Sequence, residues 1–592
     1  MGRGTKSKTL ADLLPLAAQT YGDTPAVRFK EDGQWVDRSF NEVLEIVRPL
    51  ALGLTELGVE KGDRVSILGN TRPEWTYFDF AALSIGATVV PIYQTNSPEE
   101  CRYVLENSDA KVVVVEDDEQ LEKIRKVRGG LPALEQIVRM TGSSEDALSV
   151  ADLTAKGGGV DAARWEQRYS AVTPGDICTF IYTSGTTGPP KGCVISHGNY
   201  RAMLDMVNAT SVIEGEDVSY LYLPLAHSFA LLIQLGSFDL GATIAYWECD
   251  PLKILPNLAE LKPTYFPSVP RIFEKIYTAA NSGMEKEGGL KKLVFEWAIK
   301  VGAKMRTAER SGRAPGFLLS RQYAFADNQV LSKIRNLFGG KLRLAVSGAA
   351  PINPEILRFF DAAGVLVLEG WGMTETSTAA TISTPDDFKV GTIGKPFPGC
   401  EVKIAEDGEI LVKGPNVFQG YHKNEEATRE TIVDGWLHTG DIGEIDSEGF
   451  IKITGRKKDI IITAGGKNIT PANLEADIKQ HPLVSQCVVV GDRRPYLVAL
   501  VTLDPEEAAA YAKEHDLQAS PEELAANADV KASIEAHVEE INKNYARVEQ
   551  VKKVSILPHD LSQESGELTP TLKVKRAVVA SKHEQEIEAL YA

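Results

Sequence analysis

The chain has few cysteines and no pattern that would tie them together. Six cysteines are scattered over 592 residues, with no C-x-x-C pair and no short spacing that would hold a metal ion. We therefore expect reduced thiols. Residues 1–8 lack the apolar segment of a secretory signal, and Lys6 stands where an N-myristoylation signal requires Ser or Thr. These absences predict an intracellular, cytoplasmic protein.

Positive charge is in deficit. The chain has 64 Lys and Arg against 82 Asp and Glu, which gives a net charge of -18. This charge argues against a general nucleic-acid binder and offers no basic face for anionic lipid. The hydrophobic content of 43% and the charged content of 25% are those of a globular protein, so disorder is not expected.

Long uncharged segments are also scarce. Residues 218–238 carry no formal charge and have about the length of a bilayer-crossing helix. Pro224, His227 and Gln234 interrupt this segment, and a buried helix beside an apolar cavity is the better interpretation. We predict no transmembrane segment, and peripheral contact with a membrane is left open.

The order of patterns predicts an α/β fold of more than one domain. Residues 9–130 alternate helical and strand periodicity, which is typical of helix-covered parallel or mixed sheets, and a second alternating section runs from about 194 to 390. Residues 284–321 resemble a helical insertion, and 156–159 (Lys-Gly-Gly-Gly) are expected to form a loop. Short strands from about 396 to 455 predict a small β-rich subdomain, and a smaller α+β section follows.

Residues 181–192, Ile-Tyr-Thr-Ser-Gly-Thr-Thr-Gly-Pro-Pro-Lys-Gly, follow a strand-like segment. Glycines let the backbone bend tightly and turn N–H groups toward phosphate oxygens, while Lys191 adds a positive charge. Two prolines separate Gly188 from Lys191, so the segment is not a Walker A loop. On composition alone an ordinary Gly/Thr turn fits equally well.

This segment resembles the phosphate loop of the acyl-adenylate-forming enzymes, the superfamily of acyl-CoA synthetases, nonribosomal adenylation domains and luciferases. The resemblance implies that ATP phosphates are contacted by Thr183, Ser184, Gly185, Thr186, Thr187, Gly188 and Lys191. It also implies a large N-terminal adenylation domain, residues 1–455, and a small mobile C-terminal domain, residues 456–592.

Two later motifs are similar to the superfamily's nucleotide site. Residues 347–351 form a turn of small residues in which Gly348 and Ala349 let a flat ring approach the backbone. In residues 368–376 the resemblance assigns an adenine-stacking face to Trp371 beside Gly370, an α-phosphate contact to Thr374, and magnesium to Glu375 together with Thr183. An isolated Trp would more often be a core aromatic.

The remaining motifs lie toward the C-terminus. By resemblance, Asp441 and Arg456 bind the ribose and Lys458 is the domain hinge, although Lys458 could equally be a plain surface lysine. Residues 465–471 resemble the loop that lines the pantetheine tunnel, which assigns CoA contacts to Gly466 and Lys467. In residues 567–576, Lys573 aligns with the adenylation lysine, with Lys575 as the competing register.

Two segments bear on the acid substrate. His227 occupies the superfamily's acyl-site motif, where we expect it to orient the carboxylate; a lone His in an apolar segment is otherwise a satisfied core residue. Residues 269–275, Val-Pro-Arg-Ile-Phe-Glu-Lys, are similar to a segment typical of long-chain synthetases.

The predicted function is therefore ATP- and Mg²⁺-dependent conversion of a long-chain fatty acid to acyl-AMP and then, with CoA, to acyl-CoA. The substrates Mg-ATP, fatty acid and CoA are the expected partners. The alternatives are a fatty acyl-AMP ligase that loads a carrier protein in trans and a non-catalytic nucleotide- or fatty-acid-binding paralogue. A serine hydrolase is excluded because the chain has no Gly-x-Ser-x-Gly elbow.

Overall fold

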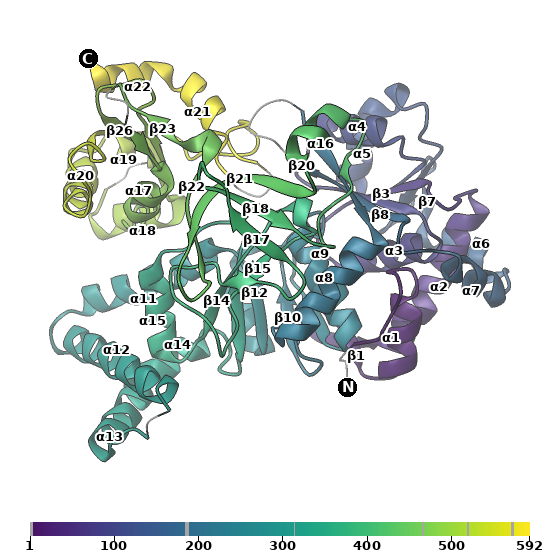
Figure 1. Ribbon diagram of the computed structural model, residues 1–592, viewed down its shortest axis with the longest axis horizontal. Helices are drawn as coiled ribbons and strands as arrows, with labels where there is room; N and C mark the ends of the chain where they lie inside the picture. Colours follow the sequence, from purple (N-terminus) through teal and green to yellow (C-terminus); the bar gives the residue numbers. More distant parts are fainter. Residues whose placement is uncertain (1–3, 184–188, 313, 465–466, 518–519, 570–572) are drawn as a thin grey trace.

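The computed structural model describes residues 4–183, 189–312, 314–464, 467–517, 520–569 and 573–592. A large body contains the first 450 residues, and a smaller unit built from the C-terminal residues packs against it at the upper left of Figure 1. The predicted division into a large α/β domain and a smaller C-terminal domain is confirmed.

An eight-stranded sheet carries the Gly/Thr-rich segment. Its order is β19-β9-β8-β4-β3-β5-β6-β7, and its centre is parallel as predicted, because each β-strand there is followed by a covering helix. The hairpin of β8 and β9 is antiparallel. The strands are β3 Arg64–Leu68, β4 Thr88–Ile92, β5 Val112–Val115, β6 Gln136–Arg139, β7 Leu148–Ser149, β8 Ile177–Thr183, β9 Lys191–Ser196 and β19 Gly420–Tyr421.

A nine-stranded sheet carries the other nucleotide motifs. Its order is β16-β15-β14-β13-β12-β10-β11-β1-β2, with parallel pairing from β1 through β11, β10, β12 and β13 to β14. The strands are β1 Pro25–Glu31, β2 Gln34–Ser39, β10 Val218–Leu221, β11 Thr243–Tyr246, β12 Tyr265–Ser268, β13 Leu344–Ser347, β14 Val367–Trp371, β15 Thr381–Ile382 and β16 Lys395–Pro396.

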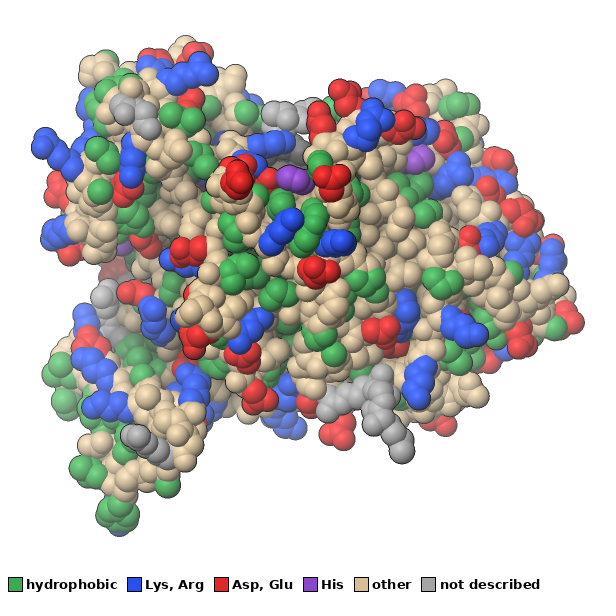
Figure 2. Space-filling model, in the orientation of Figure 1, with side chains coloured by type: hydrophobic (Ala, Val, Ile, Leu, Met, Phe, Trp, Pro, Cys, Tyr) green, Lys and Arg blue, Asp and Glu red, His purple; other side chains and the backbone are tan. Residues whose placement is uncertain are grey.

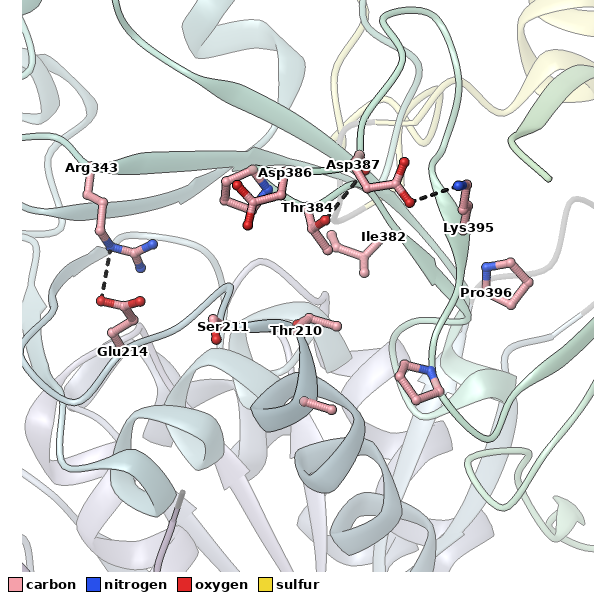
Figure 3. Close-up of a pocket in the computed structure, with 13 residues that line it drawn as sticks. Thr210, Ser211, Glu214, Arg343, Ile382, Thr384, Asp386, Asp387, Lys395 and Pro396 are labelled. Carbon is pink, nitrogen blue, oxygen red and sulfur yellow. Dashed lines mark hydrogen bonds and ion pairs between the residues drawn. The ribbon is translucent and has the colours of Figure 1, made fainter. Parts of the chain in front are cut away.

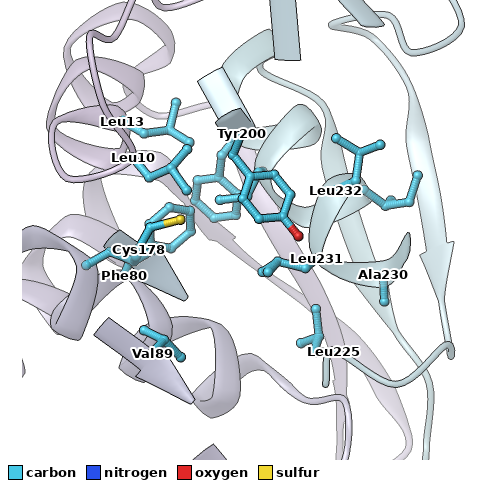
Figure 4. Packing of buried hydrophobic residues seen from close by; sticks show 14 of the residues in the cluster. Leu10, Leu13, Phe80, Val89, Cys178, Tyr200, Leu225, Ala230, Leu231 and Leu232 are labelled. Atoms are coloured by element: carbon cyan, nitrogen blue, oxygen red, sulfur yellow. The ribbon is translucent and has the colours of Figure 1, made fainter. Parts of the chain in front are cut away.

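Helices cover both sheets, and the largest apolar cluster lies among α1, α2, α3, α8 and α9. Figure 4 shows Tyr200, Leu231 and Leu232 within this cluster. The helices are α1 Leu13–Tyr21, α2 Phe40–Glu56, α3 Pro73–Ser84, α4 Pro98–Ser108, α5 Asp118–Val127, α6 Val150–Gly158, α7 Ala162–Ser170, α8 His197–Thr210, α9 Ser228–Leu240, α10 Ile254–Leu261, α11 Pro270–Glu287, α12 Gly289–Arg310, α13 Phe317–Ala326, α14 Ser332–Asn336 and α15 Pro354–Ala363.

Two sequence expectations need correction. Residues 156–158 belong to α6 rather than to a loop, because the Ser149 capping box starts this helix and Leu153 buries its inner face. Residues 218–238 are not one helix: β10 ends at Leu221, and the buried helix α9 begins only after its N-cap, His227. No helix among the described residues is long and apolar enough to cross a membrane.

The β-rich section and the C-terminal section follow. The first is a five-stranded sheet of β17 Glu401–Ile404, β18 Glu409–Lys413, β20 Ile432–Val433, β21 Trp436–Ile445 and β22 Ile451–Arg456, with α16 Glu425–Thr431. The second has its own apolar core and consists of β23 Ile461–Ile462, β24 Asn468–Ile469, α17 Pro471–Ile478, β25 Val484–Val490, β26 Leu497–Leu503, α18 Pro505–Glu514, α19 Pro521–Ala525, α20 Ala528–Asn542, β27 Val551–Ile556, α21 Arg576–Lys582 and α22 Glu584–Tyr591.

All six cysteines are free, as predicted. Cys249 is exposed and the other five are buried.

Candidate active site

The Gly/Thr-rich segment is the turn of the β8–β9 hairpin. Thr183 and Lys191 face each other as the last pair of that ladder. The predicted phosphate contacts Ser184, Gly185, Thr186, Thr187 and Gly188 lie outside the described residues. The hairpin therefore fixes the two ends of the predicted phosphate loop.

Tyr421 joins Lys191 to Glu375. The Lys191 Nζ lies 5.0 Å from the centre of the Tyr421 ring, and the Tyr421 hydroxyl donates a 2.6 Å hydrogen bond to Oε1 of Glu375. Burial, and then the Glu375 carboxylate, raise the pKa of this phenol, so it stays a donor. Sequence reasoning missed Tyr421, because its two-residue strand β19 is too short to show a periodic pattern.

The Gly-rich end of β14 leads directly into the turn that holds Glu375. A Cβ on Gly370 would lie 2.8 Å from Cδ1 of Ile382, so the neighbouring strand leaves no room for a side chain there. Thr374 and Glu375 then form a single 3₁₀ turn, Thr374–Thr376, and both are buried. A short strand followed at once by this turn puts the hydroxyl and the carboxylate side by side in the chain.

Trp371, Asp441 and Arg456 form one contact group. Trp371 Nε1 donates a 3.0 Å hydrogen bond to Asp441 Oδ2, and Arg456 Nε lies 3.5 Å from Asp441 Oδ1. Asp441 and Arg456 are partners in the β21–β22 ladder. Burial raises the pKa of Asp441, while the Arg456 guanidinium acts in the opposite direction.

The turn after β13 meets the start of α9. A Cβ on Gly348 would lie 3.4 Å from Cε1 of Phe229, and Ala349 has a φ of 67°, in the left-handed region. His227 is the N-cap of α9, and its Nδ1 accepts a 3.2 Å hydrogen bond from the backbone N–H of Phe229. Burial lowers the pKa of His227 to about 3, with Lys573 as a second cause, so the imidazole is neutral near pH 7.

Lys573 reaches this region from the C-terminal domain. Its backbone is held to Thr569 by two hydrogen bonds of 2.8 and 3.0 Å, which close a turn at the end of the tail motif. The pKa of its ammonium is lowered, first by loss of hydration and then by Arg456, against the pull of Asp441 and Glu375. The competing Lys575 is instead the N-cap of α21.

Comparison with known proteins identifies the family of the chain. The family described as "AMP-binding enzyme" matches residues 14–422, and its C-terminal domain matches residues 458–592. The chain belongs to the AMP-binding enzyme family. It is 43% identical over 566 residues to the long-chain-fatty-acid–CoA ligase FadD15 of Mycobacterium bovis, covering 95% of this chain and 93% of the relative.

Other relatives extend the similarity. The long-chain-fatty-acid–CoA ligase ACSBG2 of Xenopus laevis is 34% identical, with 98% of this chain and 84% of the relative covered. The adenylation domain of a carboxylate reductase from Mycobacterium chelonae has a TM-score of 0.79 at 22% identity, covering 99% of this chain and 92% of that one. At that identity the structural match shows the fold alone.

Of the predicted CoA residues of this AMP-binding enzyme, Lys467 is described and contacts its own domain. Gly466 is outside the described residues. Lys467 precedes β24, and its Nζ lies 4.0 Å from Oε1 of Glu549 in the same C-terminal domain. The structure therefore brings Lys191, Glu375, Trp371, Asp441, Arg456, His227 and Lys573 to one region and leaves Lys467 outside it.

A cavity of about 700 Å³ lies elsewhere on the same enzyme. Figure 3 shows Arg343 turned toward Glu214 and Asp387 toward Lys395 at its two ends. None of the predicted site residues lines it. Arg343 and Lys395, the basic residues that line it, each form an ion pair with a lining carboxylate.

Proposed function

We propose that the protein is an AMP-forming long-chain fatty acid–CoA ligase. The observation that carries this proposal is the contact group of Trp371, Asp441 and Arg456, whose charges act on Lys573 of the C-terminal domain. Two relatives, at 43% and 34% identity, are named long-chain-fatty-acid–CoA ligases. Their names support a long-chain fatty acid as the acid substrate and CoA as the acyl acceptor.

In the first half-reaction a carboxylate oxygen attacks the α-phosphorus of ATP, and the bond to pyrophosphate breaks. Lys191 and Lys573 supply positive charge where negative charge accumulates. The ribose is bound by Asp441 and Arg456. The adenine packs against Trp371 and against the turn that contains Gly348 and Ala349. Catalysis then rests on positioning and electrostatics, without a nucleophilic side chain.

His227 positions the acid in this scheme. Because its Nδ1 already accepts from Phe229, the neutral imidazole carries its proton on Nε2 and can donate there to a carboxylate. A neutral donor orients the acid without removing its negative charge.

Glu375 and Thr183 would hold Mg²⁺. Both offer the oxygen ligands that this ion prefers. The short hydrogen bond from Tyr421 fixes Oε1 of Glu375 and leaves Oε2 for the ion. When bound, Mg²⁺ neutralises phosphate charge. The remaining ligands of the ion would be phosphate oxygens and water.

The second half-reaction needs Lys573 to leave. The CoA thiol attacks the acyl carbonyl, and AMP departs with the electron pair of the broken anhydride bond. We place the domain boundary between residues 455 and 456 and the hinge at Lys458, so that rotation removes Lys573 and brings Gly466 and Lys467 toward the acyl-adenylate.

The proposal is tested with Mg-ATP, CoA and saturated fatty acids of graded length, with and without CoA. Thioester formation with a maximum at long chains is expected. Acyl-adenylate without thioester, rescued by a carrier protein, would favour the carrier-loading ligase, and ATP binding without pyrophosphate release would favour the non-catalytic paralogue.

The role of Lys573 has a test of its own. Lys573→Ala should lower acyl-AMP formation by about 10²-fold, because a charge aimed at the transition state is lost, and should spare thioester formation from supplied acyl-AMP. Lys575→Ala is the matched control and should leave both half-reactions near wild type. If Lys575→Ala gives the loss instead, the register of the tail motif is wrong.

We also propose peripheral contact with an anionic lipid surface through the helical hairpin α12–α13. Exposed apolar side chains on this projection include Leu290, Leu293, Phe317, Leu318 and Phe325. Figure 2 shows green and blue side chains together on this part, at the lower left. Binding of the enzyme to anionic vesicles tests the proposal.

A further inference from the structure

The Val-Pro-Arg-Ile-Phe-Glu-Lys segment, residues 269–275, has no part in the proposed chemistry. In the structure it begins helix α11. Arg271 and Lys275 are four residues apart, so their side chains emerge on the same helix face one turn from each other. That face carries two cations close to the C-terminal domain.

Both cations make ion pairs across the domain boundary. Arg271 Nη2 lies 2.5 Å from Asp504 Oδ2, and Lys275 Nζ lies 3.0 Å from Glu506 Oε2. The Asp504 side chain is only 9% exposed, whereas that of Glu506 is 61% exposed. The carboxylate of the first pair is therefore shielded from water, while its Arg271 side chain, 31% exposed, and both side chains of the second pair are partly exposed.

The acidic partners are built into the start of α18. Asp504 is the N-cap of this helix, and its Oδ1 accepts hydrogen bonds from the backbone N–H groups of Glu506 and Glu507. The capping fixes the carboxylate, so the other oxygen points at Arg271 without further loss of side-chain freedom. The contact is a rigid, two-point connection between α11 and α18.

A third polar contact bridges the same two domains. Asn353, the N-cap of α15, donates a 3.1 Å hydrogen bond from Nδ2 to Oδ1 of Asp477, in the last turn of α17 of the C-terminal domain. The contacts of α11 and α15 coexist with a position of Lys573 at which the charges of Asp441 and Glu375 act on the pKa of its ammonium. They therefore belong to the domain orientation that serves adenylation.

We infer that Arg271 and Lys275 are positioning residues for acyl-adenylate formation, which hold the C-terminal domain in the orientation that places Lys573 in the site. The inference rests on the proposed ligase function. Partly exposed ion pairs are individually weak, so the connection can release once acyl-AMP has formed. A hydrophobic interface of the same size would instead oppose the rotation that the thiol step requires.

The test separates the two half-reactions. In the double variant Arg271→Gln/Lys275→Gln, we expect acyl-AMP formation to fall about tenfold, because the adenylation orientation is less populated. Thioester formation from supplied acyl-AMP should stay the same or rise. Lys513→Gln, which removes one positive charge at the other end of α18, is the control and should change neither rate. Equal loss in both half-reactions would overturn the inference.

Exchanging the two charges of the Lys275–Glu506 ion pair provides a rescue experiment. Lys275→Glu should lower acyl-AMP formation, and Lys275→Glu combined with Glu506→Lys should restore it. This pair is chosen because Asp504 also caps α18, so a substitution there would disturb the helix. Failure of the exchanged pair to restore any of the lost rate would contradict the inference.

Hydrogen exchange gives a readout that needs no turnover. Amide exchange in peptides covering residues 504–507 and 353–357 should be faster in the Arg271→Gln/Lys275→Gln enzyme than in wild type or Lys513→Gln, with the rest of both domains unchanged. Unchanged exchange at both places would refute the connection. If wild type forms no acyl-AMP from any acid, the ligase proposal fails while the exchange result still decides whether these residues hold the domains together.

Discussion

Asp79 is a buried carboxyl that accepts a hydrogen bond from a side-chain amide. Asp79 lies on α3 and is 1% exposed. Its Oδ2 accepts a 2.7 Å hydrogen bond from Nε2 of Gln234 on α9. Gln234 in turn accepts from Thr76, so the amide is oriented from both ends. Burial raises the pKa of Asp79 to about 7.

This pKa gives the stability a pH dependence with a definite sign. The pKa of the carboxyl is raised above its unfolded value of 3.8, so the contribution of Asp79 to stability is present below pH 3.8 and is lost as the pH rises through about 7. Asp79→Asn keeps the shape and cannot ionise. Its stability gain over wild type should be larger at pH 8 than at pH 5.5 by ~1–2 kcal/mol, measured by thermal unfolding at both pH values. The same gain at both pH values would show that Asp79 ionises freely in the fold.

For single residues, the sequence predicts which site residues lie together when they are close neighbours in the chain. Trp371, Thr374 and Glu375 follow one another within a single motif, so their proximity needed no knowledge of the fold. The contact of Tyr421 with Lys191 could not be predicted, because it depends on β19 adding to the edge of β9 from a distant part of the chain. The same holds for Lys573, whose approach to Asp441 depends on the orientation of the two domains.

Helix α6 shows the limit of local patterns for an element. Lys156 and the glycines after it predict a loop, yet α6 crosses α2 so closely that glycine is required. A Cβ on Gly157 would lie 1.9 Å from the carbonyl oxygen of Pro49, and one on Gly53 would lie 2.3 Å from that of Leu153. Glycine here serves packing rather than turning, and only the partner helix reveals the difference.

Substitution of two neighbouring glycines tests this explanation. Gly157→Ala should destabilise the protein by ~1–3 kcal/mol, because the methyl group would overlap backbone that cannot move away. Gly158→Ala is the matched control, since nothing lies within 4 Å of its added Cβ, and alanine's helix propensity should leave it neutral or more stable by up to ~1 kcal/mol. Thermal unfolding of both variants decides, and a gain in both would mean that α6 can move away from α2.

For the whole molecule, the net charge of -18 conceals a local excess of the opposite sign. Residues 284–321, which include α12 and the first half of α13, hold nine Lys or Arg and four Glu. The expectation that no basic face exists came from an average over the chain, and it does not describe this projection. Phe317 is 74% exposed and Leu318 is 70% exposed, so basic and large apolar side chains share one protruding hairpin.

The basic and apolar side chains of the α12–α13 hairpin predict how the enzyme binds a bilayer. The wild-type enzyme should co-sediment with vesicles containing anionic lipid more strongly than with zwitterionic vesicles, and the preference should fall as salt screens the basic side chains. Phe317→Ser/Leu318→Ser should weaken binding to anionic vesicles about tenfold, because two apolar side chains no longer enter the interface. Val433→Ser, which removes an exposed apolar side chain from the β-rich sheet, is the control. Equal binding by all three proteins would exclude the hairpin as the contact, and self-association lost in the double variant would assign the hairpin to a second copy of the chain instead.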